Sequence, residues 1–155
     1  MSSVAPPRDA EQQIQEDLVR LEAYRSQLSA MLQQHQYLTA SRGDHLRSRE
    51  ALEGLERAVE GSEILIPLGA DAFLRGTAHP EQKVLLGLGA GVVVELEAPK
   101  ASEMLAERLT KLDQAARDLE GQIGTLEQRI EAMSQRVEAL SRSTSAPPAG
   151  DVGRD

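Results

Sequence analysis

The sequence contains no cysteine and no tryptophan, and its aromatic side chains are one phenylalanine and two tyrosines. Without cysteine a disulfide framework is impossible, so nothing points to a secreted disulfide-rich domain. So few aromatic rings cannot anchor a large globular core. We therefore expect a different architecture from an ordinary globule in these 155 residues.

Long apolar runs and clusters of positive charge are also missing. No segment approaches the roughly 20 consecutive apolar residues that a membrane-spanning helix needs. Residues 1–9 lack the apolar region of a signal peptide. The formal net charge of −8 would repel a phosphate backbone. We expect a cytoplasmic protein that binds neither membranes nor nucleic acid.

What the sequence does contain is typical of long helices. Ala, Glu, Lys, Leu and Arg supply 75 of the 155 residues, which is a share that coiled coils use. Apolar residues recur at helical spacing in two long segments and at every second position between them. The pattern predicts an α+β fold in five parts: a disordered N-terminus (1–8), a coiled-coil helix (9–60), two β-hairpins (61–98), a second coiled-coil helix (99–140) and a disordered tail (141–155).

The first helix has an irregular apolar stripe. Asp9 is expected to cap it, with Gln12 completing a capping box. One set of apolar residues includes Ile14, Leu18, Leu21, Leu28 and Leu32. A second set recurs every seven residues as Tyr24, Met31, Leu38, His45, Leu52 and Val59. The stripe is therefore expected to drift around the helix, and the sequence leaves open whether the helix kinks or frays near Gly43.

The second helix carries the cleaner pattern. Its apolar residues step by four and three without a break, which predicts a coiled-coil seam. The seam consists of Leu105, Leu109, Leu112, Ala116, Leu119, Ile123, Leu126, Ile130, Met133, Val137 and Leu140. Gly121 and Gly124 fall on outward positions and leave the seam intact. Two such helices, joined by about 40 residues of hairpins, can fold back antiparallel.

The hairpin region is expected to need partners. Strands at 63–68, 73–77, 83–88 and 92–97 are separated by turns that contain Gly69 and Gly89-Ala90-Gly91. Isolated two-stranded hairpins are marginal in water, and their open edges invite pairing with another chain. We favour assembly over a private core within one chain. The assembly candidates are Ile64, Ile66, Leu68, Phe73, Val84, Leu86, Val92 and Val94.

The hairpin sequence resembles that of a known family. The segments 65–69 (LIPLG), 73–76 (FLRG) and 84–92 (VLLGLGAGV) are similar to the central region of alpha-class prefoldin subunits. Tyr24-x-x-Gln27 is similar to a short pattern in archaeal members. The resemblance covers roughly residues 12–140. Gly43, in the middle of a helix, departs from the family pattern.

The resemblance implies a function and a set of partners. Alpha-class subunits assemble with beta-type subunits as a hexamer of two alpha and four beta chains, on a platform of two β-barrels. Unfolded polypeptides are held at the tips of the coiled-coil arms without ATP and passed to a group II chaperonin. The apolar residues expected at this tip are Ile14, Leu18, Val19, Met133, Val137 and Leu140. All of them except Val19 could equally be ordinary seam residues.

Two other classes of function would account for part of the sequence. A scaffolding coiled-coil subunit of another assembly would share the helices but lack affinity for unfolded chains. A nucleotide-binding protein would rest on Gly87-x-Gly89-x-Gly91, but a strand at Val92 follows where a helix N-terminus would be needed. No paired carboxylates, triad or zinc-ligand spacing stands out. We expect no catalytic residues, no cofactor and no metal.

Overall fold

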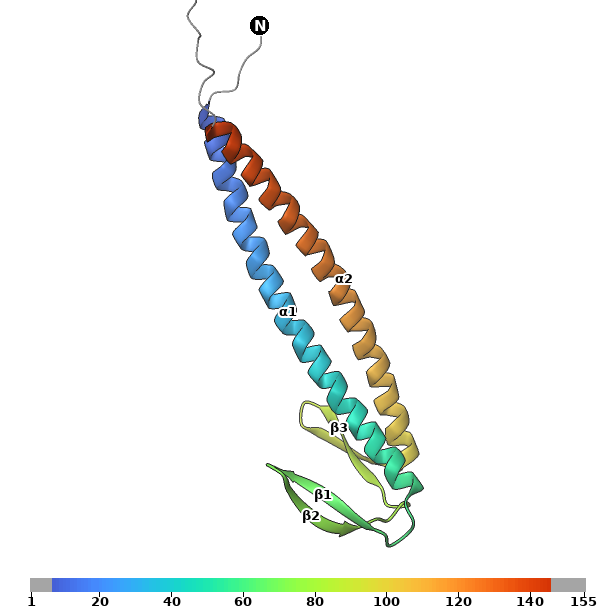
Figure 1. Cartoon of the computed structure of the whole chain (residues 1–155). Coiled ribbons are helices and arrows are strands. Elements are labelled where there is room, and N and C mark those ends of the chain that lie inside the picture. Colours follow the sequence, from blue (N-terminus) through green and yellow to red (C-terminus); the bar gives the residue numbers. More distant parts are fainter. Residues whose placement is uncertain (1–6, 146–155) are drawn as a thin grey trace, which may run out of the picture. The chain divides into compact units, whose positions relative to one another are not determined.

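The computed structural model describes residues 7–145 and confirms the predicted fold class (Figure 1). Two long helices enclose two antiparallel hairpins in the sequence. The elements are α1 (Pro7–Arg57), β1 (Glu63–Gly69), β2 (Ala72–Thr77), β3 (Val84–Gly89), β4 (Val92–Leu96) and α2 (Ala98–Ser145). The chain divides into two compact units. We call them the helical unit (described residues 7–36 and 118–145) and the hairpin unit (Tyr37–Arg117).

The helix boundaries differ from those expected. Helix α1 begins at Pro7, so Asp9 lies in its first turn and does not cap it; its charge there suits the helix dipole. The helix ends at Arg57 and not at residue 60. Helix α2 runs to Ser145, so residues 141–145 are helical where a disordered tail was expected. The remaining expected termini, 1–6 and 146–155, lie outside the described residues.

Hydroxyl groups in the last turns of α2 donate hydrogen bonds to carbonyl groups of the same helix. Ser141 Oγ donates a hydrogen bond to the carbonyl of Val137 at 2.9 Å, and Ser145 Oγ donates to the carbonyl of Ser141 at 2.7 Å. Thr144 Oγ1 reaches the carbonyls of Leu140 and Ser141. Serine and threonine hydroxyl groups commonly donate hydrogen bonds to carbonyl groups of the preceding helical turn in this way. Residues that favour a loop by composition are therefore accommodated in the helix.

In the helical unit, α1 and α2 run antiparallel. Their direction follows from two contacts: Asp17 pairs with Arg136, and His35 pairs with Glu120. Leu21, Leu119, Ile123 and Leu126 form the buried centre. The α2 seam predicted from the sequence is confirmed, because every one of its residues is buried or half-buried.

The drifting stripe predicted for α1 is wrong. Leu18 and Leu32 are exposed, and the inward positions advance regularly by three and four. These inward residues are Ile14, Asp17, Leu21, Tyr24, Leu28, Met31, His35 and Leu38. Asp17 and His35 are polar, so the apolar residues of this one seam looked like two separate sets in the sequence. The spacing of the seam is regular, but its side chains are partly polar and partly apolar.

The hairpin unit begins with the C-terminal part of α1 and ends with the N-terminal part of α2. Helix α1 stays helical through Gly43, a point that the sequence left open. Arg42 Nε donates to Asp113 Oδ1 at 2.5 Å, which joins the two helices in this unit. Leu105, Leu109, Ala98 and Ala101 are buried. Val59, expected in the seam, follows the end of α1 and is 76% exposed.

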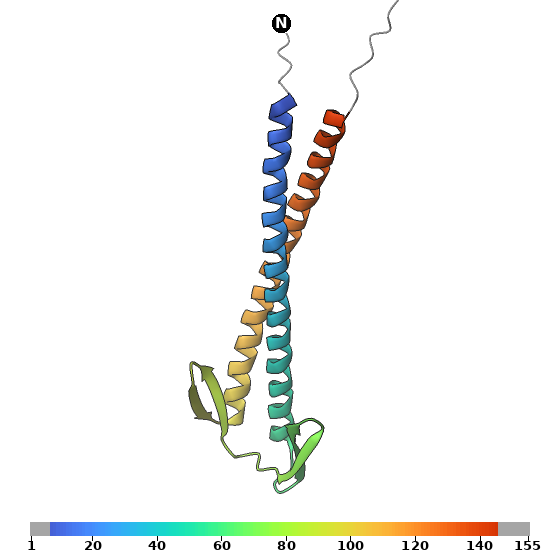
Figure 2. The same cartoon turned by 90° about the vertical axis from the view of Figure 1, so that its left-hand side faces the viewer.

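Each hairpin forms its own two-stranded sheet (Figure 2). In the first, Ile64 lies opposite Gly76 and Ile66 opposite Leu74. In the second, Val84 lies opposite Leu96 and Leu86 opposite Val94. Both turns have two central residues with positive φ, as the tightest right-twisting hairpin turns require. The predicted turns at Gly69 and at 89–91 are confirmed.

Alanine occupies a left-handed position in both turns. Ala70 has φ of 49° and Ala90 has φ of 50°. A Cβ in this region is disfavoured by roughly 1 kcal/mol. The residue after Ala90 is Gly91, which adopts the same region without a Cβ. The backbone of each turn is therefore mildly strained at its alanine.

Candidate functional site: two apolar surfaces

The first candidate surface lies on the hairpins. Among the assembly candidates, Ile66, Leu68, Phe73 and Val92 are exposed. Ile64, Val84, Leu86 and Val94 are half-buried. The hairpins therefore present large apolar side chains that their own chain does not cover. Surfaces of this kind mark contacts with other molecules.

Sequence reasoning listed only part of this surface. Further exposed apolar residues on the strands are Leu65, Leu74, Leu85, Leu88 and Val93. Because side chains alternate along a strand, Leu65 lies on the face opposite to Ile64, and Leu85 on the face opposite to Val84. Both faces of each hairpin are thus partly apolar. Leu74 and Leu88 extend the first face, because Leu74 lies opposite Ile66 and Leu88 is two residues from Leu86. Period-two alternation on both faces was the signal that could have found the five residues.

Part of the first face packs within the hairpin unit. A hollow of about 240 Å³ is lined by Ile64, Ile66, Val84 and Leu55, together with Thr77, Ala78, His79, Gln82 and Lys83. Ile66 lies against the neighbouring strand, since a Cβ added at Gly76 would lie 2.9 Å from its Cδ1 and the side chain would have to shift. Residues of both hairpins and Leu55 of α1 therefore line one open hollow.

The two hairpins differ in the hydrogen bonds beyond their strands. The open end of the first is closed by backbone hydrogen bonds between its flanking residues, from Gly61 N to Ala78 O and from Ala78 N to Ser62 O, at 2.9 and 2.8 Å. His79 pairs with Glu60 beside them. The second is held by a side chain, because Arg108 Nη2 donates to Gly87 O at 2.8 Å. The first hairpin thus closes with backbone groups alone, whereas the second is bonded to α2 through one arginine.

The second candidate surface is where α1 begins and α2 ends. Figure 1 shows these two helix ends at the same end of the helical unit. We call it the distal patch, and it consists of Ile14, Leu18, Val19, Met133, Val137 and Leu140. Leu18 and Val19 are exposed, while the other four are half-buried seam residues. The structure therefore brings seam residues and exposed apolar residues onto the same pair of helix ends.

A buried charge in this region was missed by sequence reasoning. Asp17 is 2% exposed, and its Oδ2 lies 3.1 Å from Arg136 Nε. That contact is an ion pair without hydrogen-bond geometry, so Oδ2 has no hydrogen-bond partner among the described residues. Buried carboxylates are tolerated only when they are paired. The missed signal was a charge at seam spacing between Ile14 and Leu21.

The glycine-rich segment forms part of the second hairpin. Gly87 and Gly89 belong to β3, Gly91 lies in the turn, and β4 follows, so the glycine-rich segment is a hairpin and not a dinucleotide loop. No three His, Cys, Asp or Glu side chains of residues 7–145 are grouped as a metal site would require. None of the helices described is long and apolar enough to cross a bilayer.

Comparison with known proteins gives the family. The model of the family described as "Prefoldin subunit" matches residues 24–143, which is more than half of the chain. The chain belongs to the prefoldin family. The resemblance to alpha-class prefoldin that the hairpin sequence suggested is thereby confirmed. Prefoldins are chaperone subunits, and the family is not known for enzymatic activity.

Individual relatives agree with this assignment. Prefoldin subunit alpha of Methanocorpusculum labreanum is 28% identical over 126 residues, covering 81% of this chain and 86% of that protein. Prefoldin subunit alpha of Methanoculleus marisnigri is 30% identical over 122 residues, covering 79% and 78%. Both relatives carry the alpha name.

Solved structures support the fold. A chain of filamentous PFD from Methanocaldococcus jannaschii superposes with a TM-score of 0.63 at 24% identity, covering 79% of this chain and 98% of that one. The prefoldin beta subunit from Thermococcus strain KS-1 gives a TM-score of 0.55 at 19% identity, covering 95% and 100%. Both likenesses show that the fold of this chain is that of prefoldin subunits.

Proposed function

We propose that this chain is the alpha-type subunit of an ATP-independent holdase of the cytoplasm. The hairpins join beta-type subunits in a platform, as a hexamer of two alpha and four beta chains. The distal patch captures unfolded polypeptides, which are then passed to a group II chaperonin. The observation that carries the proposal is the contrast between buried helix seams and hairpins that expose apolar side chains on both faces.

The two surfaces have separate tasks in this proposal. Hairpin side chains such as Leu85 and Val93 lose water only when another subunit covers them, which favours association. Capture at the distal patch is weak for a single contact, because few side chains take part. Several arms acting on one polypeptide raise the overall affinity through effective concentration. Holdase activity should therefore depend on assembly.

The test measures suppression of aggregation of a denatured protein without ATP. The full chain is used alone and with a beta-type partner, and the mass of the complex is followed by light scattering. A double variant, Val137→Ser with Leu140→Ser, should weaken suppression and leave the mass of the complex unchanged. Val59→Ser is the matched control, since Val59 is exposed and lies outside both surfaces.

The outcomes separate the candidate functions. A variant that dissociates the complex, or that suppresses aggregation as well as the parent, would rule out the distal patch as the capture site. A stable complex of the parent chain that suppresses nothing would instead favour a scaffolding prefoldin-like subunit. Transfer to a chaperonin is tested by adding a group II chaperonin with ATP and measuring recovery of the folded test protein.

A further inference from the structure

A hollow on one flank of the helical unit has no role in the function proposed above. It has a volume of about 240 Å³ and is lined by Tyr24 of α1 and by Arg129, Ala132, Met133 and Arg136 of α2. We call it the arginine-flanked hollow. Only Met133 is shared with the distal patch.

The base of this hollow is apolar and adaptable. Residues 129, 132, 133 and 136 lie on one face of α2, because side chains three and four positions apart are neighbours on a helix. Ala132 is the smallest of the four side chains that line the hollow. Tyr24 and Met133 are half-buried beside it. A phenol ring and a flexible thioether make favourable contacts with aromatic side chains of varied shape.

The two arginines at this hollow differ in whether they pair with an acidic side chain. Arg136 is paired with the buried carboxylate of Asp17. Arg129 is exposed and makes no ion pair with any residue that the structure describes. The residues three and four positions from it on α2 are Thr125, Leu126, Ala132 and Met133, none of which is acidic. In a chain of net charge −8, Arg129 is thus an exposed cation without an ion pair among the described residues, at the edge of a hollow that Ala132 and Met133 also line.

We propose that the arginine-flanked hollow binds an aromatic side chain whose neighbour in an unfolded polypeptide is Asp or Glu. The ring enters between Tyr24 and Met133, and the carboxylate meets Arg129. A guanidinium also attracts the face of an aromatic ring, so both parts of the ligand favour the same place. This inference rests on the proposed holdase function and names a class of segment that the arm prefers.

The test uses the full chain, alone and with its beta-type partner, and three fluorescein-labelled 12-residue peptides. The first has a central Phe between two Asp residues, the second replaces both Asp with Lys, and the third replaces Phe with Ser. Anisotropy at low salt should show the Asp–Phe peptide binding about three- to fivefold more tightly than the Lys–Phe peptide, as a solvent-exposed ion pair allows. The difference should shrink at high salt.

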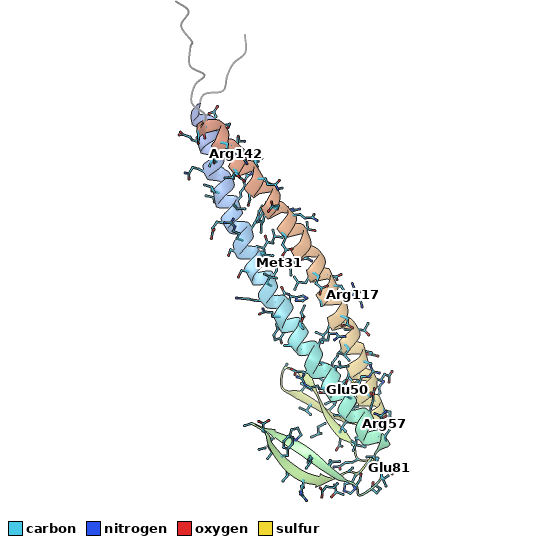
Figure 3. The ribbon with its side chains drawn as sticks, viewed as in Figure 1. Met31, Glu50, Arg57, Glu81, Arg117 and Arg142 are labelled. Carbon is cyan, nitrogen blue, oxygen red and sulfur yellow. The ribbon has the colours of Figure 1, made fainter. Side chains whose placement is uncertain are left out.

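Two variants locate the preference. Arg129→Gln should remove the difference between the Asp and Lys peptides and leave a common residual affinity. Arg117→Gln is the matched control on α2, at a site that Figure 3 labels, and should keep the difference. Ala132→Phe fills the hollow and should weaken binding of both Phe peptides. Circular dichroism melting of each variant verifies that the helices remain folded.

The result can overturn the inference without touching the proposed function. Equal binding of the Asp and Lys peptides, no binding of any peptide, or an unchanged preference in Arg129→Gln would each rule out the site. Suppression of aggregation, measured on the same samples, reports separately on the holdase. Normal suppression with no peptide preference rejects the hollow alone, whereas loss of suppression by the parent chain rejects the proposed function.

Discussion

The paired helices and the two hairpins place the same kinds of side chain in opposite environments. Leu126 of α2 is 5% exposed, whereas Leu85 of β3 is 74% exposed. The helix seam completes its burial within the chain, so it contributes to the stability of the isolated subunit. The hairpin residues become stabilising only when another surface covers them. Folding of the chain and its assembly therefore depend on separate residues, which can be changed independently.

The largest loss of stability is expected in the α2 seam. Leu126→Ala removes a buried side chain and leaves a cavity, so the free energy of unfolding should fall by about 3 kcal/mol. Urea denaturation followed by circular dichroism measures the change on the chain alone. Val19→Ala, at an exposed position of the distal patch, is the control and should change stability by less than about 0.5 kcal/mol. Equal effects of the two changes would contradict the assignment of the seam.

The buried charge should give the next largest effect, with opposite signs for its two partners. Arg136→Ala leaves the Asp17 carboxylate buried and unpaired, which should lower the free energy of unfolding by about 2 kcal/mol. Asp17→Leu removes the buried charge and frees the half-exposed Arg136, which should raise stability by about 1 kcal/mol. Thermal melts compare both with the parent. Destabilisation by Asp17→Leu would mean that the attraction between Asp17 and Arg136 exceeds the free-energy cost of removing the carboxylate from water.

These polar seam residues also mark the limit of what the sequence predicted. The α2 seam and the hairpins were readable, because every seam residue of α2 is apolar and glycine marks the turns. The α1 seam was not, since Asp17 and His35 look like surface residues in a local pattern. Their partners, Arg136 and Glu120, are more than 80 residues away in the chain. Only the folded arrangement reveals that these positions face inward.

Some of the candidate surfaces could likewise be predicted from the sequence, and one could not. Alternation along the strands predicted the first apolar face of each hairpin, and the same rule extends to Leu65 and Leu85 on the second. The end of the helical unit could be named from the helix spacing. The arginine-flanked hollow could not, because it arises where Tyr24 of one helix meets Ala132 and Met133 of the other. The spacing of residues along one element predicts which side chains share a face. A hollow between two helices can be located only when it is known which residues of one helix lie beside which residues of the other.

Glycine on the outward face of α2 offers a smaller, stabilising change. Gly121→Ala should raise the free energy of unfolding by up to about 1 kcal/mol, because alanine is the better helix former. No atom lies within 4 Å of the Cβ that would be added there. Gly124→Ala has the same open surroundings and serves as a replicate. If both variants melt at lower temperature than the parent, that face of α2 is not free in the folded protein.

The smallest effect on the isolated chain is expected on the hairpins, and there the comparison is tested most directly. Leu85→Ser should change the free energy of unfolding of the chain by less than about 0.5 kcal/mol, because its side chain is already in water. The same change should lower the mass of the complex with beta-type partners, since it removes apolar surface that association would bury. Denaturation of the chain alone and light scattering of the mixture measure the two quantities. Loss of chain stability without loss of assembly would show that the hairpin surface serves the subunit's own fold, and the division between folding and assembly residues would fail.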